Sequence, residues 1–346
     1  MAELRVDLYS DTHTRPTQAM RAAIAAAEVG DEQAFEDPTV NRLCEAAAGL
    51  LGKEAAVFMP SGTMCNQVAF RVHCRPGDEI ILDALAHPLN SEAGGPAAVS
   101  GAATRPVEGE RGIFTADQVR AALRPLRRHA PRSRVLSLEN TVNFGGGAVW
   151  PLEAVAEVAA VARENGLAVH MDGARLLNAV VESGTPARAY AAHCDSIWID
   201  LSKGLGCPIG AVLAGSAAFV DQAWRFKQQL GGAMRQAGIV AAAGLYALEH
   251  HVERLAEDHE NARAFAAAIA EVPGVSLAYP QCETNIVFFD LDAAGPDAQE
   301  VARRLRERGV RIGAMGPRRM RAVTHLDVDR AGVEAAAAAL RDVLAG

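Results

Sequence analysis

The chain has 346 residues, of which 22% are charged, and its formal net charge is −8 at pH 7. This length predicts one large domain and a smaller one, and an acidic chain without a dominant basic cluster argues against nucleic acid as a partner. No stretch reaches the about 20 apolar residues of a membrane span, and the N-terminus lacks the apolar core of a signal peptide. The six cysteines and ten histidines show no metal-ligand spacing. We therefore expect a cytoplasmic protein with reduced thiols, no membrane contact and no metal.

Apolar strands and amphipathic helices alternate through the first two thirds of the chain. Residues 1–15 are expected to be extended, Pro16 to open a short helix that ends near Gly30, and Asp37 to begin a helix that stops at Gly52. The expected strands are 55–59, 79–82, 135–138, 167–171, 196–201 and 211–214, and the expected helices between them are 63–72, 116–126 and 152–165. This alternation predicts an α/β fold with a mainly parallel sheet of the seven-stranded type between helices.

The last third of the chain has a different pattern. Beyond Met234 the spacing predicts one long helix that runs through His250 to Ile269. Strands at 285–290 and 321–325 and helices at 297–308 and 330–344 are expected after it. We place the domain boundary within the long helix, so that residues 1–245 form a large domain with an extended N-terminal segment and residues 246–346 form a smaller α+β domain.

The stretch D-L-S-K-G-L-G-C-P-I-G places one lysine, Lys203, directly after an apolar strand and among three glycines. Small neighbours leave room for a bulky group, and an amine in apolar surroundings is more readily neutral and able to attack a carbonyl. The stretch therefore predicts a Schiff-base lysine. A surface lysine in a glycine-rich turn is the alternative, and three further stretches decide between the two.

The segment Pro60–Thr63 lies between an expected strand and an expected helix. Its small residues, Ser61, Gly62 and Thr63, allow backbone N–H groups at the helix N-terminus to approach an anion, and the hydroxyls add hydrogen bonds. The segment matches neither a Walker loop nor a dinucleotide fingerprint. It predicts a phosphate site, and an ordinary N-cap turn is the alternative.

The stretch V-H-M-D-G-A-R places Asp172 at the end of a buried strand, where a carboxylate needs a cationic partner to remain ionised. Arg175 is one such partner, in a purely structural pair. The functional interpretation is that Asp172 faces the protonated ring nitrogen of pyridoxal 5'-phosphate (PLP) and keeps the ring an electron sink. Lys203 follows one helix and one strand later, a spacing that suits two strand ends meeting at one cleft.

A histidine follows the strand at 79–82. His87 precedes E-A-G-G, and its planar ring is suited to stack on the face of a cofactor; a packing or helix-cap histidine is the alternative. A phosphate cradle, a stacking ring, a carboxylate for the ring nitrogen and a lysine follow one another in the order expected of a PLP enzyme of the aspartate-aminotransferase type, fold type I.

At this point the chain resembles a known family, the low-specificity L-threonine aldolases of the β-eliminating-lyase branch. The resemblance runs nearly from end to end. Its motifs are L-Y-S-D-T-H-T-R-P at 8–16, E-D-P-T-V-N-R-L at 36–43, P-S-G-T-M at 60–64, L-E-N-T at 138–141, D-G-A-R-L at 172–176, L-S-K-G-L-G at 201–206, L-G-G-A-M-R-Q-A-G at 230–238 and V-T-H-L-D-V at 323–328.

The resemblance implies a role for each matching residue. Lys203 would carry PLP as a Schiff base, Asp172 would hold the ring nitrogen, His87 would stack on the ring, and Ser61, Gly62 and Thr63 would bind the phosphate. Ser10, Arg175 and Arg321 would hold the carboxylate of an amino-acid substrate. Arg235 would reach the cofactor region of a neighbouring subunit, for which a helix-end salt bridge is the alternative. The implied reaction is retro-aldol cleavage of an L-β-hydroxy-α-amino acid to glycine and an aldehyde, in a homodimer or homotetramer with shared sites.

The chain departs from the family pattern near the expected pocket. The histidine of E-N-T-H-N is Val142, the tyrosine–glycine pair before E-D-P is Ala34–Phe35, and the cysteine three residues before the lysine is Asp200. His13 replaces a residue that is commonly apolar. We expect His87, His13 or a water held by either to take the β-hydroxyl proton. Replacement by Ala34 and Val142 is expected to favour bulkier, phenylserine-like substrates over threonine.

Two other functions remain open at this stage. A PLP enzyme without a base directed at the hydroxyl is also suited to β-elimination, racemisation or transfer of the amino-acid carbanion to another aldehyde. A PLP-fold protein without catalysis is the third hypothesis, but such proteins typically lose the lysine or the aspartate, and this chain keeps Lys203 and Asp172.

Overall fold

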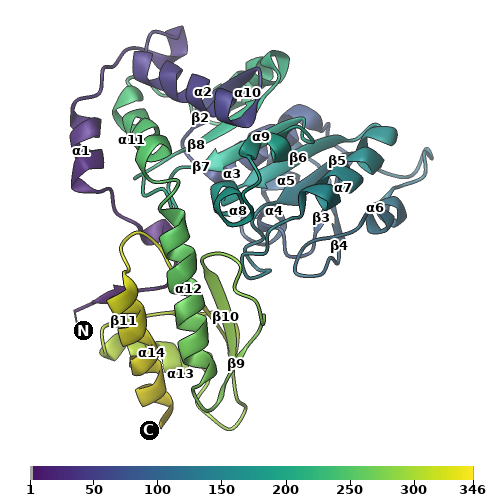
Figure 1. Ribbon diagram of the computed structural model, residues 1–346. Helices are drawn as coiled ribbons and strands as arrows, with labels where there is room; N and C mark the ends of the chain where they lie inside the picture. The colour runs from purple at the N-terminus through teal and green to yellow at the C-terminus, as the bar shows by residue number, and fades with distance from the viewer. Residues whose placement is uncertain (1–2, 346) are drawn as a thin grey trace.

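The computed structural model describes residues 3–345, and its largest element is a seven-stranded sheet (Figure 1). The strand order is β2-β8-β7-β6-β5-β3-β4. The strands are β2 (Ala55–Met59), β3 (Asp78–Asp83), β4 (Ala103–Val107), β5 (Arg132–Glu139), β6 (Ala168–Gly173), β7 (Ser196–Asp200) and β8 (Ala211–Gly215). β8 runs antiparallel to both of its neighbours, and the other pairs are parallel. The expected α/β fold with a mainly parallel sheet is confirmed.

Alternate side chains of the strands enter two layers of the core. Phe58 of β2 packs in a cluster with α2 (Pro38–Leu51), α7 (Leu152–Glu164) and α9 (Ala187–Ala191), whereas Val57 and Met59 pack against α3 (Gly62–His73) and α10 (Ala217–Gln229). Helices therefore cover both faces, which is why the strands are apolar almost throughout. The other helices of this part are α1 (Gln18–Ala25), α4 (His87–Asn90), α5 (Gly95–Ser100), α6 (Ala116–Ala122), α8 (Leu176–Ser183) and α11 (Gly238–His250).

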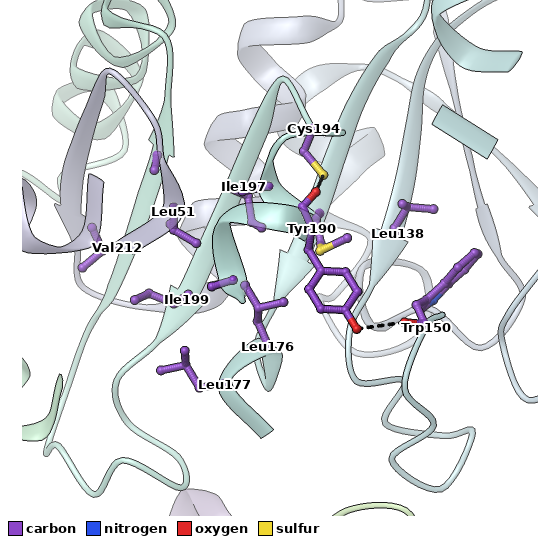
Figure 2. Packing of buried hydrophobic residues seen from close by; sticks show 14 of the residues in the cluster. Leu51, Leu138, Trp150, Leu176, Leu177, Tyr190, Cys194, Ile197, Ile199 and Val212 are labelled. Carbon is purple, nitrogen blue, oxygen red and sulfur yellow. Dashed lines mark hydrogen bonds between the residues drawn. The ribbon is translucent and has the colours of Figure 1, made fainter. Parts of the chain in front are cut away.

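The larger core cluster includes the fully buried side chain of Tyr190, whose hydroxyl needs a polar partner. Figure 2 shows the Tyr190 hydroxyl turned toward Trp150, to whose carbonyl oxygen it donates at 3.1 Å, among Leu138, Leu176 and Ile197. This hydrogen bond satisfies the one polar atom of a tyrosine that is only 1% exposed.

The start and stop of α2 follow the sequence signals. Asp37 Oδ1 accepts hydrogen bonds from the amides of Thr39 at 3.1 Å and Val40 at 3.0 Å, which is the N-cap arrangement, with Pro38 as the first helical residue. Gly52 ends the helix with φ 61°, a left-handed conformation that glycine adopts without a steric penalty. Both predicted ends are confirmed.

The C-terminal third is built on a four-stranded antiparallel sheet of order β12-β13-β10-β9. Its elements are α12 (Leu255–Ala270), β9 (Val275–Leu277), β10 (Ile286–Leu291), α13 (Ala298–Glu307), β11 (Val310–Arg311), β12 (Gly313–Ala314), β13 (Arg319–Val323) and α14 (Arg330–Ala345). The helices pack on this sheet through a separate apolar cluster. Within residues 3–345, no helix combines the length and apolar character needed to cross a bilayer.

The N-terminal segment joins this C-terminal unit. β1 (Val6–Asp7) pairs in parallel with β11, so both chain ends lie at the same end of the molecule (Figure 1). The segment then passes through the 3-10 turn at Asp11–His13 toward the large sheet. The division into residues 1–245 and 246–346 stays a prediction.

The structure differs from the expectation in several elements. The expected single helix through His250 to Ile269 is two helices, α11 and α12, separated at residues 251–254. There the buried His251 ring bonds through Nδ1 to the Leu205 carbonyl oxygen at 2.7 Å, a tertiary contact that leaves no local signal. The strand β4 was not predicted because it contains Pro106, and proline argues against a strand unless the strand lies at the edge of a sheet, as β4 does. The other elements not anticipated are α4, α5, α8, α9, α10, β9, β11 and β12.

Candidate active site

A cavity of about 380 Å³ opens where the carboxyl ends of β5, β6 and β7 meet the C-terminal sheet. Ligand sites of open α/β sheets typically lie at such strand ends. The cavity-lining residues are Ser10, Thr12, Gly62, Thr63, His87, Ser91, Glu139, Asn143, Phe144, Asp172, Ala174, Arg175, Trp198, Asp200, Lys203, Met315 and Arg321. The large sheet, the N-terminal segment and β13 thus all contribute to one site.

Lys203 follows β7 and reaches the cavity. Its Nζ forms an ion pair with Asp200 Oδ2 at 2.7 Å, and its side chain is 17% exposed. Asp200 is held in turn by the amide and the hydroxyl of Ser202, which both donate to Oδ1 at 2.8 Å. The position that holds a cysteine in the family pattern therefore contacts the candidate Schiff-base amine directly.

Asp172 lies buried at the end of β6 beside the cavity, and its hydrogen-bond donors are uncharged amides rather than the Arg175 guanidinium. Its Oδ2 accepts from Asn66 Nδ2 at 2.7 Å, and its Oδ1 accepts from the Ala174 amide at 3.0 Å. Burial raises the pKa of this carboxyl, while the charges of His87 and Lys203 and the Asn66 hydrogen bond act in the opposite direction. The Asp172–Arg175 pair, considered as an alternative, is not formed.

Arg175 instead binds Asp11, a residue that sequence analysis left without a role. Arg175 Nε and Nη2 donate to the two oxygens of Asp11 at 2.7 Å each, and both side chains are buried. Burial alone would raise the pKa of Asp11, but the charge and the hydrogen bonds of Arg175 outweigh it and hold that pKa well below its usual value. Asp11 therefore orients the arginine at the cavity wall.

His87 begins α4 and is tied to two carboxylates. Its Nδ1 lies 2.8 Å from Glu92 Oε1, and its backbone amide donates to Glu139 Oε2 at 2.7 Å. Burial alone would lower the pKa of His87, but the Glu92 hydrogen bond and the surrounding carboxylates outweigh it, so the net shift is upward. Because Glu92 accepts at Nδ1, the Nε2 atom is the ring nitrogen left for other contacts.

Glu139 is a second residue to which sequence analysis assigned no role, although it belongs to the L-E-N-T motif. It ends β5, and its two oxygens accept from the amides of His87 and Asn143 at 2.7 and 2.8 Å. Burial, with the nearby Asp172 charge, raises the pKa of Glu139 to about 7. A carboxyl that titrates near neutrality therefore lies among the cavity-lining groups.

Gly62 and Thr63 form the first turn of α3 at the cavity. Ser61 is the N-cap, and its Oγ accepts from the Met64 amide at 3.2 Å, so the capping interpretation of this serine is confirmed. The amides of Gly62 and Thr63, in the first turn, have no acceptor within the helix. A Cβ at Gly62 would overlap the Trp198 ring, so only glycine fits between this ring and the cavity.

Arg321 of β13 reaches the cavity from the C-terminal sheet. Its Nη1 donates to Asn143 Oδ1 at 2.9 Å, and its buried Nε has no partner among residues 3–345. Burial and the charge of Arg175 lower the pKa of Arg321. Ser10, at the same wall, accepts from the Thr12 hydroxyl at 2.8 Å. Two arginines close enough to repel, one with a free N–H, suit an anionic ligand.

Six residues assigned to the site from the sequence are not among the cavity-lining residues, and one of them, Ser61, is the N-cap of α3 beside Gly62. His13 stacks on Tyr9 and bonds to Asp7, and Val142 packs in the core against the Gly112 backbone. The other three, Ala34, Phe35 and Arg235, belong to one surface region beside Asp31. Phe35 is 66% exposed, and the Arg235 side chain, 63% exposed, pairs with Asp31 at 2.7 Å. That ion pair is of the kind considered as the alternative for Arg235.

These groups fit PLP. The buried carboxylate of Asp172 is suited to accept a hydrogen bond from the protonated ring nitrogen of PLP, and the Lys203 amine is suited to react with its aldehyde. The helix amides at Gly62 suit the phosphate of PLP. The geometry therefore defines a PLP-dependent enzyme of fold type I.

Comparison with known proteins agrees with this class. Residues 7–293 match the beta-eliminating lyase family. The low specificity L-threonine aldolase of Escherichia coli K12 is 42% identical over 341 residues, which cover 98% of this chain and 99% of that relative. The low-specificity L-threonine aldolase 1 of Arabidopsis thaliana is 38% identical over 333 residues, 95% of this chain and 93% of that relative.

The fold also matches a solved structure. The threonine aldolase of Leishmania major superposes with a TM-score of 0.84 at 18% identity and covers 98% of this chain and 100% of that one. This identity supports the fold alone. On the sequence matches, the chain belongs to the beta-eliminating lyase family, in the branch of the low-specificity L-threonine aldolases.

Proposed function

We propose that this PLP-dependent enzyme cleaves L-β-hydroxy-α-amino acids to glycine and an aldehyde by retro-aldol reaction. The observation that supports it most directly is the single cavity that gathers Lys203, Asp172, His87 and two arginines from four separate parts of the chain. When bound, PLP supplies the electron sink into which the electrons of the breaking Cα–Cβ bond pass.

The polar residues at the cavity are proposed to fix the positions of PLP and of the amino-acid substrate relative to each other. Asp172 would hold the ring nitrogen, Gly62 and Thr63 the phosphate, and Lys203 the aldehyde carbon. Ser10, Arg175 and Arg321 would hold the substrate carboxylate, with the unpartnered Nε of Arg321 as one donor. A fixed carboxylate decides which bond at Cα lies perpendicular to the ring, so these residues would select the reaction as well as the substrate.

His87 is the favoured acceptor of the β-hydroxyl proton. Glu92 holds its Nδ1, which leaves Nε2 free to accept, and the ring is a cavity-lining group. His13 remains the second candidate, but its ring stacks on Tyr9 and is not among the cavity-lining groups. The variants His87→Ala and His13→Ala separate the two: the base is the histidine whose loss lowers kcat. If both variants turn over at the wild-type rate, neither histidine is the base.

The preference for bulkier β-substituents rests on other residues than expected. Val142 lies in the core, and the apolar side chains of Phe144 and Met315 are among those that line the cavity. These two side chains support a substrate with an apolar or aryl group at Cβ. Far faster cleavage of threonine than of phenylserine would contradict this preference.

Assembly and location also remain proposals. Phe35 and Arg235 lie outside the cavity of their own chain, so a role for them in the site requires a second copy, as a homodimer or homotetramer would supply. A cytoplasmic location is proposed with them. Sedimentation of the purified protein measures the oligomeric state.

The test of the proposed reaction is product analysis. We expect purified protein with PLP to release glycine and the matching aldehyde from a panel of L-threonine, L-allo-threonine and L-phenylserine, and not from the D enantiomers. Release of ammonia and a keto acid without glycine would favour β-elimination instead.

A further inference from the structure

One buried amide, that of Asn66 in α3, connects the groups beneath the candidate cofactor site. Asn66 is 0% exposed, and each end of its amide makes two hydrogen bonds. Its Nδ2 donates to Asp172 Oδ2 at 2.7 Å and to Glu92 Oε1 at 2.7 Å. Its Oδ1 accepts from Trp198 Nε1 at 2.7 Å and lies 3.0 Å from His170 Nε2. The side chain therefore uses its full set of two donors and two acceptors.

The orientation of this amide has no alternative. The two carboxylates accept hydrogen bonds, so the NH₂ group must face them, and the Trp198 indole only donates, so the oxygen must face it. His170 must then donate from Nε2, which leaves its Nδ1 to accept from Ser196 Oγ at 2.8 Å. Burial lowers the pKa of His170 to about 3, in agreement with one neutral tautomer.

The amide holds together two carboxylates with different tasks. Asp172 is at the floor of the cavity, and Glu92 bonds to His87, the candidate stacking ring. Without Asn66, Asp172 Oδ2 would be left in a buried site without its donor, which favours the neutral carboxylic acid over the carboxylate. A neutral Asp172 has no charge with which to hold a protonated ring nitrogen.

We propose that Asn66 is a positioning residue that keeps Asp172 ionised and aimed at the ring nitrogen of PLP, by holding Asp172 and Glu92 on one amide group. The inference rests on the proposed function, because it requires PLP in this cavity. Asn66 itself is not among the cavity-lining residues, so it acts through Asp172.

The test compares two ligands on the apoprotein. One is PLP, and the other is an analogue in which carbon replaces the ring nitrogen. Wild-type protein is expected to bind PLP at least about tenfold more tightly than the analogue, because only PLP meets Asp172. Asn66→Ala is expected to weaken PLP binding about tenfold and to leave the analogue within about twofold of wild type. Equilibrium dialysis gives the four dissociation constants without any turnover.

Asn261→Ala is the matched control. Asn261 is also a buried asparagine, but its Nδ2 donates to the Val328 carbonyl oxygen at 3.2 Å in the C-terminal unit. This variant is expected to keep the wild-type ratio of the two affinities. Asn66→Ser serves as a second variant of smaller volume change if Asn66→Ala does not fold.

The outcomes separate the two proposals. If an Asn66 variant weakens both ligands equally, or neither, Asn66 does not act through the ring nitrogen and this inference is wrong while the proposed function stands. If wild-type protein itself binds both ligands equally, the contact between Asp172 and the ring nitrogen is absent and both proposals fall. Nitrogen NMR of His170 in the apoprotein provides a separate check: the Nε2–H tautomer is expected, and the Nδ1–H tautomer would contradict the amide orientation.

Discussion

Arg175 pairs with Asp11 and not with Asp172, although Asp172 is three residues away and Asp11 is 164 residues away in the sequence. The pair has two parallel hydrogen bonds of 2.7 Å and is buried from water. Asp11 comes from the 3-10 turn after β1, and Arg175 precedes α8. The N-terminal segment is thereby attached to the large sheet at the wall of the cavity.

Replacing Asp11 should be costly because it leaves a buried guanidinium without its counter-charge. We expect Asp11→Asn to lower the free energy of unfolding by about 3 kcal/mol or more. Asp290→Asn is the matched control: Asp290 binds Arg319 in the same two-bond geometry, at 2.8 and 2.7 Å, but at the surface. There the loss should be about 1 kcal/mol or less. Urea unfolding measures both, and equal losses would contradict the argument from burial.

Arg321 is expected to hold the substrate carboxylate through its planar fork. Arg321→Lys keeps the charge but loses this fork, so KM for the amino acid should rise at least about tenfold. The control is Arg319→Lys, two residues earlier on β13, whose arginine pairs with Asp290 at the surface. Steady-state kinetics that show an unchanged KM for Arg321→Lys would remove this residue from the carboxylate site.

Glu139 should make stability depend on pH. Its pKa rises from the ordinary 4.5 to about 7 in the folded protein, chiefly through burial. The folded state therefore binds more protons than the unfolded state between these values, and the stability contributed by this group falls as pH rises through that window and stays low above about 7. Glu139→Gln does not titrate, so its stability relative to wild type should increase by up to about 3 kcal/mol over the window.

Unfolding of both proteins in urea at several pH values from about 5 to about 8 measures this difference. Loss of one accepted hydrogen bond in the glutamine variant shifts its whole curve by a constant amount, so only the slope against pH matters. A stability difference that stays constant across this range would show that Glu139 titrates normally.

Gly62 is expected to be irreplaceable at the start of α3. The added methyl group of Gly62→Ala would overlap the Trp198 ring, so the helix end must shift and PLP affinity should fall at least about tenfold. Gly49→Ala is the control, since an added methyl group at Gly49 of α2 would meet nothing within 4 Å beyond its chain neighbours and the backbone of its own helix. That variant should bind PLP normally and gain up to about 1 kcal/mol of stability. Equal PLP affinities of the two variants, by fluorescence titration, would contradict the role given to this turn.

The sequence predicts most of the large sheet because its strands carry strong local signals. Residues 55–59 match β2 without error, and the two ends of α2 follow from Asp37 and Gly52. Short elements such as α4 and β12 were missed because few residues leave little periodicity. The break between α11 and α12 was missed because it depends on the contact of His251 with Leu205.

Some residues of the candidate site could likewise be predicted from local motifs, whereas others could not. Lys203, Asp172, His87 and Arg321 stand in recognisable motifs, and the fold brings them to one cavity. Asn66, Asp11 and Glu139 each have a partner at least 26 residues away in the sequence, so no local pattern reveals their role. Even so, Asp11 and Glu139 lie inside motifs that were noted, and their charge at buried positions was a usable signal.

Covalent attachment of PLP to Lys203 is the central claim, and borohydride reduction tests it directly. The chain has only three lysines, Lys53, Lys203 and Lys227. Lys227 is buried in an ion pair with Glu32, and Lys53 donates to a backbone carbonyl oxygen. After reduction of the PLP-loaded protein and proteolysis, mass spectrometry should find the cofactor on the peptide that contains Lys203, and nowhere in Lys203→Ala. Cofactor on Lys53 or Lys227, or on no lysine, would contradict the account.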